Sequence, residues 1–373
     1  MFIHSHRLDE IGYPSAVPLA TRRAGLTRER LASMGLLSGP NRAEVAPEPA
    51  SREALETFHT PRYLDLLRRA ADGAEPGLDG LMIGLGTVDC PVFKDVYDYP
   101  ALACGASLLG ADLLLEGRTQ IAFNPSGGYH HAGPEKAAGF CYLNDVAIAC
   151  LHLAEHGRRV LYLDVDVHHG DGVQNVFYDR ADVMTLSFHE SGLTLFPGTG
   201  FEDELGSGAG RGYAVNVPFR VGTYDAAYLR AFRAIAPPLI GAFDPDVIVL
   251  ELGMDALAGD PLANLKLTNN AHVAVLQSVL EFDTPMLVTG GGGYHVDNTV
   301  RGWALAWAVL CGEDSEGDEL AGLGGVMLET TDWAGGLRDR QVVPDEADRR
   351  FVDVAVDKTI EAIRKTVFPM HGL

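Results

Sequence analysis

The sequence predicts an α/β fold, a mainly parallel β-sheet flanked by helices on both faces. Short runs rich in Val, Ile and Leu, typical of strands buried on both faces of a parallel sheet, alternate with longer segments of helical periodicity. This alternation is the pattern of a doubly wound α/β domain. No segment has the composition of a flexible interdomain linker, so we expect the 373 residues to form one domain spanning 1–373.

The expected elements follow in chain order. Five runs are predicted to be strands of the sheet: residues 120–125, 159–168, 183–188, 246–252 and 285–289. Three segments between strands are predicted to be helices: residues 143–156, 224–243 and 270–282. Residues 45–83 mix loops with helical segments, one of them at 61–71. An acidic, Gly-rich loop is expected at 312–336, before a final helix at 345–366.

The composition limits the classes of partner. The formal net charge is -22, from 51 acidic and 29 basic residues. Because binding to nucleic acid requires Lys and Arg to neutralise phosphates, direct nucleic-acid binding is not expected. The acidic balance is compatible with a basic partner, such as a lysine-rich protein segment or a polyamine, although it can equally serve solubility alone.

The sequence also bears on the compartment. No apolar run is long enough to span a bilayer, and the N-terminus carries no secretory signal. The five cysteines are scattered and lie mostly in apolar surroundings, as expected of reduced thiols and not of a disulfide framework. We therefore expect a cytoplasmic protein without membrane contact, and its oligomeric state stays open.

Carboxylates interrupt the apolar run at residues 160–171. Side chains two residues apart in a strand share one face, so Asp164, Asp166 and His168 are expected to point the same way at its carboxyl end. Because an unpartnered buried carboxylate is costly, the pattern indicates a metal site. Asp255, which follows another expected strand, is the candidate third ligand beside Asp166 and His168. Taken alone, Asp255 could equally cap a turn, but two Asp and one His would leave coordination positions open, as in catalytic sites.

Two adjacent histidines, His130 and His131, lie on a Gly-rich loop directly after the strand expected at 120–125. A carboxylate bonded to one ring nitrogen orients an imidazole and supports its charge. Asp164 and Asp171 are the candidate partners of His130 and His131. His–Asp pairs beside a metal are the components of a general acid–base hydrolase.

A run of four glycines, residues 290–293, follows the strand expected at 285–289. Glycines allow the backbone to approach a ligand closely, and the run lacks the Gly-Lys-Ser/Thr ending of a phosphate-binding loop. Tyr294, directly after it, can donate its phenolic proton to an oxyanion. The alternative is a flexible turn before the helical segment that carries Trp303 and Trp307.

These motifs, in this order, resemble the histone deacetylase family within the arginase/deacetylase superfamily. The matching blocks are residues 127–132, 139–145, 164–172, 196–200, 253–255 and 290–294. The likeness runs from about residue 89 to residue 303 and is greatest to class I-like bacterial members, which include acetoin-utilisation deacetylases. It implies the arginase/deacetylase fold and hydrolysis of the acetyl amide of Nε-acetyl-lysine in proteins, which releases acetate.

The resemblance implies roles for individual residues. Asp166, His168 and Asp255 would bind zinc, or iron in some members. His131, with Asp171, would act as general base and then as acid, and His130, with Asp164, would give electrostatic support. Tyr294 would polarise the acetyl carbonyl. The implied substrate-binding residues are Asp89, Gly139, Phe140, Phe196, Leu262 and Gly292. Among them Phe140 and Phe196 would form the aromatic walls of a narrow channel, which suits the tetramethylene stem of lysine. Asp89 would bind the substrate backbone at the rim.

Two structural potassium sites are also implied by the resemblance. The first would use Asp164, Asp166, His168, Ser187 and Phe188, and the second Phe177, Arg180, Val183 and Tyr213. Three residues depart from the usual family pattern: Tyr129, Met254 and His295. Because Met254 and His295 adjoin expected catalytic residues, we expect them to influence channel width, and the preferred acyl length stays open.

Three alternative functions remain. The first is deacetylation of small acetylated amines such as polyamines, by the same chemistry. The second is a non-catalytic module that only binds acyl-lysine, which predicts loss of Tyr294 or of a metal ligand, yet all are present. The third is an arginase-like ureohydrolase, which would need two metals and more carboxylates around residues 164–168.

Overall fold

The computed structural model describes residues 1–313 and 336–373. Within them, one sheet of eight strands, all paired in parallel, has the order β2-β1-β3-β8-β7-β4-β5-β6. The strands are β1 Phe2–Ile3, β2 Glu44–Val45, β3 Ile121–Asn124, β4 Val160–Asp164, β5 Val183–Glu190, β6 Ala214–Phe219, β7 Val247–Glu251 and β8 Met286–Thr289. The acidic loop expected at 312–336 lies outside the described residues, apart from its two ends.

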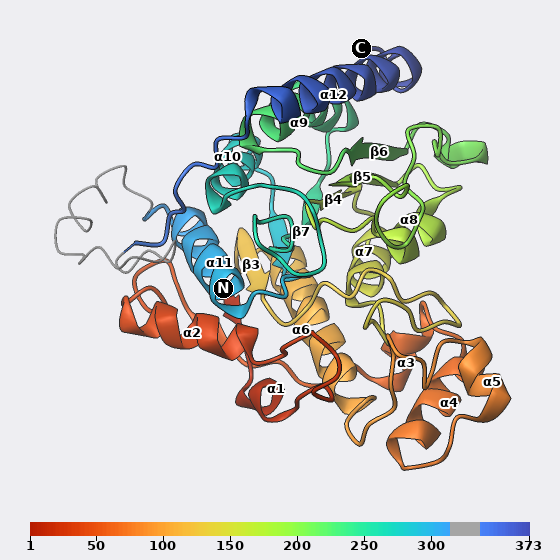
Figure 1. The fold of residues 1–373 in the computed structure, drawn as a ribbon. Coiled ribbons are helices and arrows are strands. Elements are labelled where there is room, and N and C mark those ends of the chain that lie inside the picture. The colour runs from red at the N-terminus through yellow and green to blue at the C-terminus, as the bar shows by residue number, and fades with distance from the viewer. Residues whose placement is uncertain (314–335) are drawn as a thin grey trace.

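Helices cover both faces of the sheet (Figure 1), which confirms the predicted fold class. One face is covered by α2 Arg23–Ser33, α9 Asp225–Phe243, α10 Asn269–Leu280, α11 Val296–Leu310 and α12 Glu346–Thr366. The other is covered by α4 Pro61–Ala71, α6 Asp98–Leu115, α7 Asp145–Glu155 and α8 Asp171–Phe177. The short helices are α1 His6–Glu10, α3 Arg52–Glu56 and α5 Gly77–Met82. Among the described helices, none has the length and apolarity to cross a membrane.

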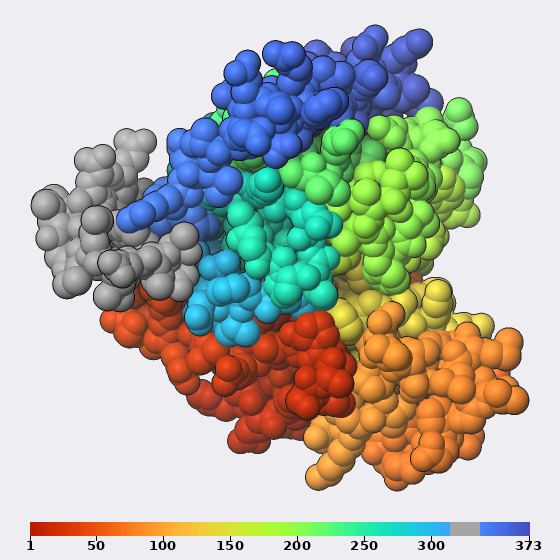
Figure 2. All heavy atoms as spheres, viewed as in Figure 1, coloured from red at the N-terminus to blue at the C-terminus, as the bar shows by residue number. Residues whose placement is uncertain are grey.

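The strand sequences explain the two helical layers. In β4, Leu161 and Leu163 belong to the core under α9 to α12, whereas Val160 and Tyr162 belong to the core under α6 and α7. Successive strand residues point to opposite faces, so a strand buried on both sides must be apolar throughout. In the space-filling view, the N-terminal residues (red) and those of α3 to α6 (orange) cover the lower part of the visible face, and α12 (blue) covers the upper part (Figure 2).

One predicted strand is shorter than expected. The strand expected at 159–168 ends at Asp164, so the expectation that Asp164, Asp166 and His168 alternate along one strand is wrong. The aspartates themselves end the strand: Asp164 Oδ1 accepts the N–H of Asp166 at 3.0 Å, and Asp166 Oδ1 accepts the N–H of His168 at 2.9 Å. Such local bonds compete with the pairing of strands.

Some elements were not predicted. Most residues of α6 are buried, so the helix shows no polar stripe from which periodicity could identify it. β6 contains Asn216 and Pro218, residues that are uncommon in strands, and its place at the edge of the sheet explains why Pro218 is tolerated.

The register of the central strands determines where their loops begin. Asn124, Thr289, Glu251 and Asp164, the last residues of β3, β8, β7 and β4, are consecutive pairing partners across the sheet. The chain order reverses around β4, which has β5 on one side and β7 on the other. Such switch points at the carboxyl ends of strands are where α/β folds bind ligands.

Candidate active site

Three buried side chains meet at this edge of the sheet. Ligand atoms of Asp166, His168 and Asp255 lie within 4.8 Å of one another. His168 Nδ1 is 3.2 Å from Asp166 Oδ1 and 3.0 Å from Asp255 Oδ2. Backbone N–H groups hold both carboxylates, from Gly292 to Asp166 Oδ2 at 2.6 Å and from Val167 to Asp255 Oδ1 at 3.0 Å. The group thus has two carboxylates and one imidazole, the donor set of a catalytic divalent-metal site.

Burial and mutual contact shift the protonation of this group. Burial alone would lower the pKa of His168, but hydrogen bonds and charges from Asp166 and Asp255 raise it to about 10. Burial, and then the neighbouring charge of Asp166, raise the pKa of Asp255 to about 7. Without metal the group therefore holds protons at neutral pH, which a bound ion would displace.

The histidine pair lies beside Asp166, His168 and Asp255. The Nε2 atoms of His130 and His131 are 3.1 Å apart, and His130 Nε2 is 3.9 Å from Asp166 Oδ1. His130 Nδ1 bonds to Asp164 Oδ2 at 3.0 Å, and His131 Nδ1 bonds to Asp171 Oδ1 at 2.8 Å. The structure therefore joins each histidine to the aspartate predicted as its partner.

The N-terminus of α7 holds the histidine loop in place. Asp145 Oδ1 accepts the N–H of Gly128 at 3.0 Å and of Tyr129 at 2.8 Å. Asn144 caps α7 through its Oδ1 and donates from Nδ2 to the carbonyl of His130 at 3.1 Å. Two consecutive polar residues thus fix the helix start and the loop together.

The two histidines titrate in opposite directions. Burial alone would lower the pKa of His130, but the charges of Glu251 and Asp164 raise it well above its usual value. Burial and the adjacent charge of His130 lower the pKa of His131 to about 4, despite its bond to Asp171. At neutral pH His131 is therefore a neutral base beside a cationic His130, and such a separation of pKa values marks acid–base machinery.

Glu251 was not predicted as a site residue. It is fully buried at the end of β7, and its Oε1 lies 3.0 Å from His130 Nδ1 as an ion pair. The Tyr162 hydroxyl lies 2.6 Å from Asp164 Oδ2 and 2.8 Å from Glu251 Oε2, and burial raises the pKa of Glu251 to about 8. The signal was present in the sequence, because Glu251 ends an apolar strand just as Asp164 does.

The glycine run requires its small residues. A Cβ built on Gly292 would lie 1.9 Å from Asp255 Oδ2, so only glycine fits there without displacing that carboxylate. Arg23, on α2, donates to the carbonyls of Gly291 at 3.0 Å and Gly293 at 2.5 Å. Arg23 was also absent from the predicted site.

Tyr294 follows the glycine run and lines the same cavity as the histidines. Asp260 accepts the N–H of Tyr294 at 2.7 Å and that of Leu262 at 2.9 Å, so one unpredicted side chain positions both loops. Burial and the charges of Asp255 and Asp166 raise the pKa of Tyr294 well above its usual value. Its phenol therefore remains a proton donor at neutral pH.

Aromatic rings stand at the mouth of the site. The Phe196 ring is 43% exposed and its centre lies 4.9 Å from that of His131, while the Phe140 ring lies 5.8 Å from that of Tyr294. Gly139 lies between the rings of His131 and Phe196, because a Cβ built on it would be 2.5 Å from the first ring and 2.9 Å from the second. Phe140 has a φ of 66°, a strained backbone typical of functional sites. Gly139 and Phe140 also line the cavity that contains the histidine pair and Tyr294.

Other predicted residues lie outside this cavity. Asp89 is exposed on the loop after α5, and Leu262 is half-buried on the loop held by Asp260. Met254 packs against Gly302 in the core, and His295 caps α11 by accepting the N–H of Asn298 at 3.3 Å. Neither residue is among those that line the cavity, and their expected influence on channel width stays a prediction. Tyr129 does line the cavity.

The residues expected to bind potassium fall into two places. Ser187 pairs with Asp164 in the sheet, and its hydroxyl bonds to His189 Nδ1 at 2.7 Å. The second set surrounds the connection between α8 and β5, where the Phe177 carbonyl accepts the N–H of Arg180 at 3.0 Å. The members of this set are Phe177, Arg180, Val183 and Tyr213.

Comparison with known proteins extends these observations. Residues 17–310 match the family model described as the histone deacetylase domain. The chain is 40% identical to Histone deacetylase 8 of Xenopus tropicalis over 315 residues, 84% of each protein. It is 38% identical to Histone deacetylase RPD3 of Saccharomyces cerevisiae over 301 residues, 80% of this chain and 68% of that protein. The crystal structure of an HDAC homolog from Aquifex aeolicus superposes with a TM-score of 0.83 at 29% identity, covering 96% of this chain and 99% of that one.

Proposed function

Because this chain belongs to the histone deacetylase family, we propose that it hydrolyses the acetyl amide of Nε-acetyl-lysine in proteins and releases acetate. The observation that carries the proposal is the pairing of a neutral His131 with Asp171, beside the group of Asp166, His168 and Asp255.

The residues at the site suit a divalent metal. Asp166, His168 and Asp255 offer two carboxylate oxygens and one imidazole nitrogen, which suit zinc or ferrous iron. Such an ion, when bound, lowers the pKa of water and polarises a carbonyl group. A second group with metal-ligand spacing, His130 with Asp164 and Glu251, lies next to this site and contacts His131 through His130.

The side chains then divide the proton transfers. His131 accepts a proton from the attacking water as its oxygen bonds to the acetyl carbon. It returns that proton to the lysine nitrogen as the carbon–nitrogen bond breaks, which yields acetate and the free amine. Cationic His130, supported by Asp164 and Glu251, stabilises negative charge next to this exchange. Tyr294 donates a hydrogen bond to the carbonyl oxygen as it becomes an oxyanion.

The entrance suits a long, thin side chain. Phe140 and Phe196 would contact the apolar lysine stem, with Gly139, Leu262 and Gly292 completing the walls. Asp89 would accept backbone N–H groups of the substrate at the rim, and the net charge of -22 favours lysine-rich segments.

The two sets of residues expected to bind potassium would each hold one structural potassium ion. The free thiols of all five cysteines support the cytoplasm as the compartment.

The test compares two substrates on metal-loaded protein, an acetyl-lysine peptide and an acetylated polyamine. We expect peptide turnover that chelation abolishes and zinc restores. His131→Ala and Tyr294→Phe should reduce kcat at least about 100-fold, whereas His156→Ala, an exposed histidine at the end of α7, should not. Turnover of the polyamine alone would make the enzyme a small-molecule deacetylase. Peptide binding without turnover of either substrate would make it an acyl-lysine binding module.

A further inference from the structure

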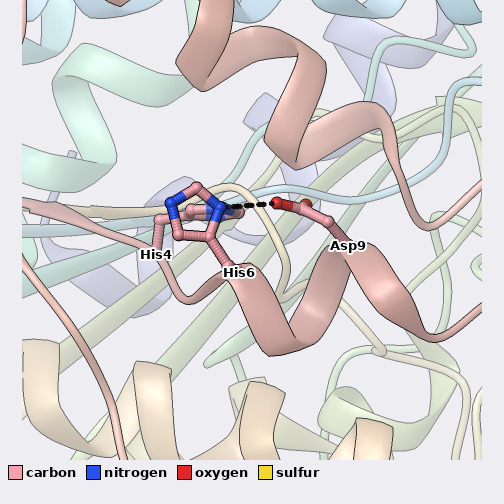
Figure 3. A group of neighbouring side chains, drawn as sticks. All are labelled: His4, His6 and Asp9. Atoms are coloured by element: carbon pink, nitrogen blue, oxygen red, sulfur yellow. Dashed lines mark hydrogen bonds and ion pairs between the residues drawn. The ribbon is translucent and has the colours of Figure 1, made fainter.

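A second cluster of metal-ligating side chains lies at the N-terminus, outside the candidate active site. His4 directly follows β1, and His6 and Asp9 belong to α1. The three side chains point toward one another (Figure 3), and their ligand atoms lie within 4.8 Å. His4 Nε2 is 3.0 Å and His6 Nδ1 is 3.5 Å from the same oxygen, Asp9 Oδ2.

These separations suit atoms that share one ion. Atoms that bind a zinc ion at about 2.1 Å in tetrahedral geometry lie about 3.4 Å apart. The two distances to Asp9 Oδ2 fall on either side of this value. They also match the group at the active site, where His168 Nδ1 lies 3.2 Å and 3.0 Å from two carboxylate oxygens. The His6 side chain is 77% exposed, so it is free to close on an ion.

Hydrogen bonding leaves two buried atoms of this cluster without a partner. The His4 side chain is 2% exposed, and both His4 Nδ1 and Asp9 Oδ1 are buried without a hydrogen-bond partner. The chain nevertheless makes room for the carboxylate: a Cβ on Gly25 of α2 would lie 2.2 Å from Asp9 Oδ1. A cation bound at Asp9 Oδ2 would offset the charge of a carboxylate whose other oxygen has no partner, which one bond from a neutral His4 does not do.

We propose that His4, His6 and Asp9 bind one divalent transition-metal ion of the zinc class, with water at the remaining positions. Two imidazoles and one carboxylate favour zinc and its neighbours over calcium or magnesium, which prefer oxygen. The ion would be structural. It would tie β1 to α1 and press Asp9 against α2, the helix whose Arg23 holds the glycine run beside Tyr294.

The test counts zinc ions on the full chain. Metal-free wild type, His6→Ala and a matched control, His156→Ala, are titrated calorimetrically with zinc alone. Wild type and the control should bind one more zinc ion per chain than His6→Ala. The affinity for that ion should fall more than about 100-fold in His6→Ala, beyond the loss typical of residues that only support a ligand.

Equal zinc counts in wild type and His6→Ala would overturn the proposal, as would loss of the same ion in His156→Ala. Asp9→Asn, which preserves shape, should reproduce the loss if the effect of His6→Ala is due to coordination. The readout is a difference in bound zinc, so a failure of the deacetylase proposal would leave it unchanged.

Discussion

Glu251 Oε1 lies 3.0 Å from His130 Nδ1, the nitrogen that Asp164 Oδ2 also contacts at 3.0 Å. A single buried imidazole therefore faces two carboxylates from the ends of neighbouring strands, and Tyr162 bonds to both. This arrangement fixes His130 as a cation and sets the electrostatic environment of His131.

Glu251→Gln should shift the pH dependence of catalysis. Burial raises the pKa of Glu251 to about 8, so its charge develops on the alkaline side, where it raises the pKa of His130. Glutamine keeps an oxygen for Tyr162 but carries no charge at any pH, so His130 should lose its proton at a lower pH in the variant. The alkaline limb of kcat/KM should therefore move to lower pH, with KM nearly unchanged. An unaltered pH–rate profile would show that Glu251 does not tune the pair.

Gly292→Ala should abolish metal binding at the active site. Its Cβ would lie 1.9 Å from Asp255 Oδ2 and must displace that carboxylate. We expect zinc affinity and kcat to fall at least about 100-fold, by titration and by deacetylation assay. The matched control is Gly241→Ala, on an exposed turn of α9 with nothing within 4 Å of the new Cβ. That variant should retain activity and gain up to about 1 kcal/mol in unfolding free energy.

Asp260→Asn should act through Tyr294. Asparagine leaves only one acceptor oxygen for the two N–H groups, those of Tyr294 and Leu262, that Asp260 now holds. We expect kcat to fall about 10-fold in the wild-type background and much less in Tyr294→Phe, because contacting residues are not additive. Additive losses in the double mutant would show that Asp260 acts independently of Tyr294.

Zinc affinity at the active site should rise with pH. Without metal, His168 has a pKa of about 10, above its usual 6.5, because Asp166 and Asp255 outweigh burial. Its proton stabilises the fold fully below pH 6.5, and this contribution is lost as pH rises through about 10. Burial raises the pKa of Asp255 to about 7, so this carboxyl also releases a proton near neutrality.

Zinc must displace these protons, so we expect affinity to increase between about pH 6 and pH 8, by up to about tenfold per pH unit for each proton. Competition with a chromophoric chelator would measure the zinc affinity at each pH. Over the same range the metal-free protein should lose thermal stability relative to the zinc-loaded protein. A binding constant independent of pH would contradict the assigned protonation of His168 and Asp255.

The sequence by itself determined the fold class and the order of the chemical motifs. Strands buried on both faces are apolar throughout, and a short stretch of sequence is enough to identify such a composition. β7 and β8 begin and end within one residue of their predicted limits, and β4 begins within one residue of its predicted start but ends at Asp164. Pairing of His130 with Asp164 and of His131 with Asp171 also followed from residues at the carboxyl ends of strands. The sequence did not predict α6, because a helix that is buried on nearly all sides has no polar stripe.

Only the tertiary structure decided which distant groups meet. Glu251 and Asp164 are 87 residues apart in sequence, and it is strand register that makes them neighbours. Likewise Asp260 reaches the N–H of Tyr294, and Met254 packs against Gly302, because side chains in loops take their directions from three-dimensional packing. A local pattern records the face that a residue presents, whereas its partner across the sheet depends on how the strands are ordered and aligned.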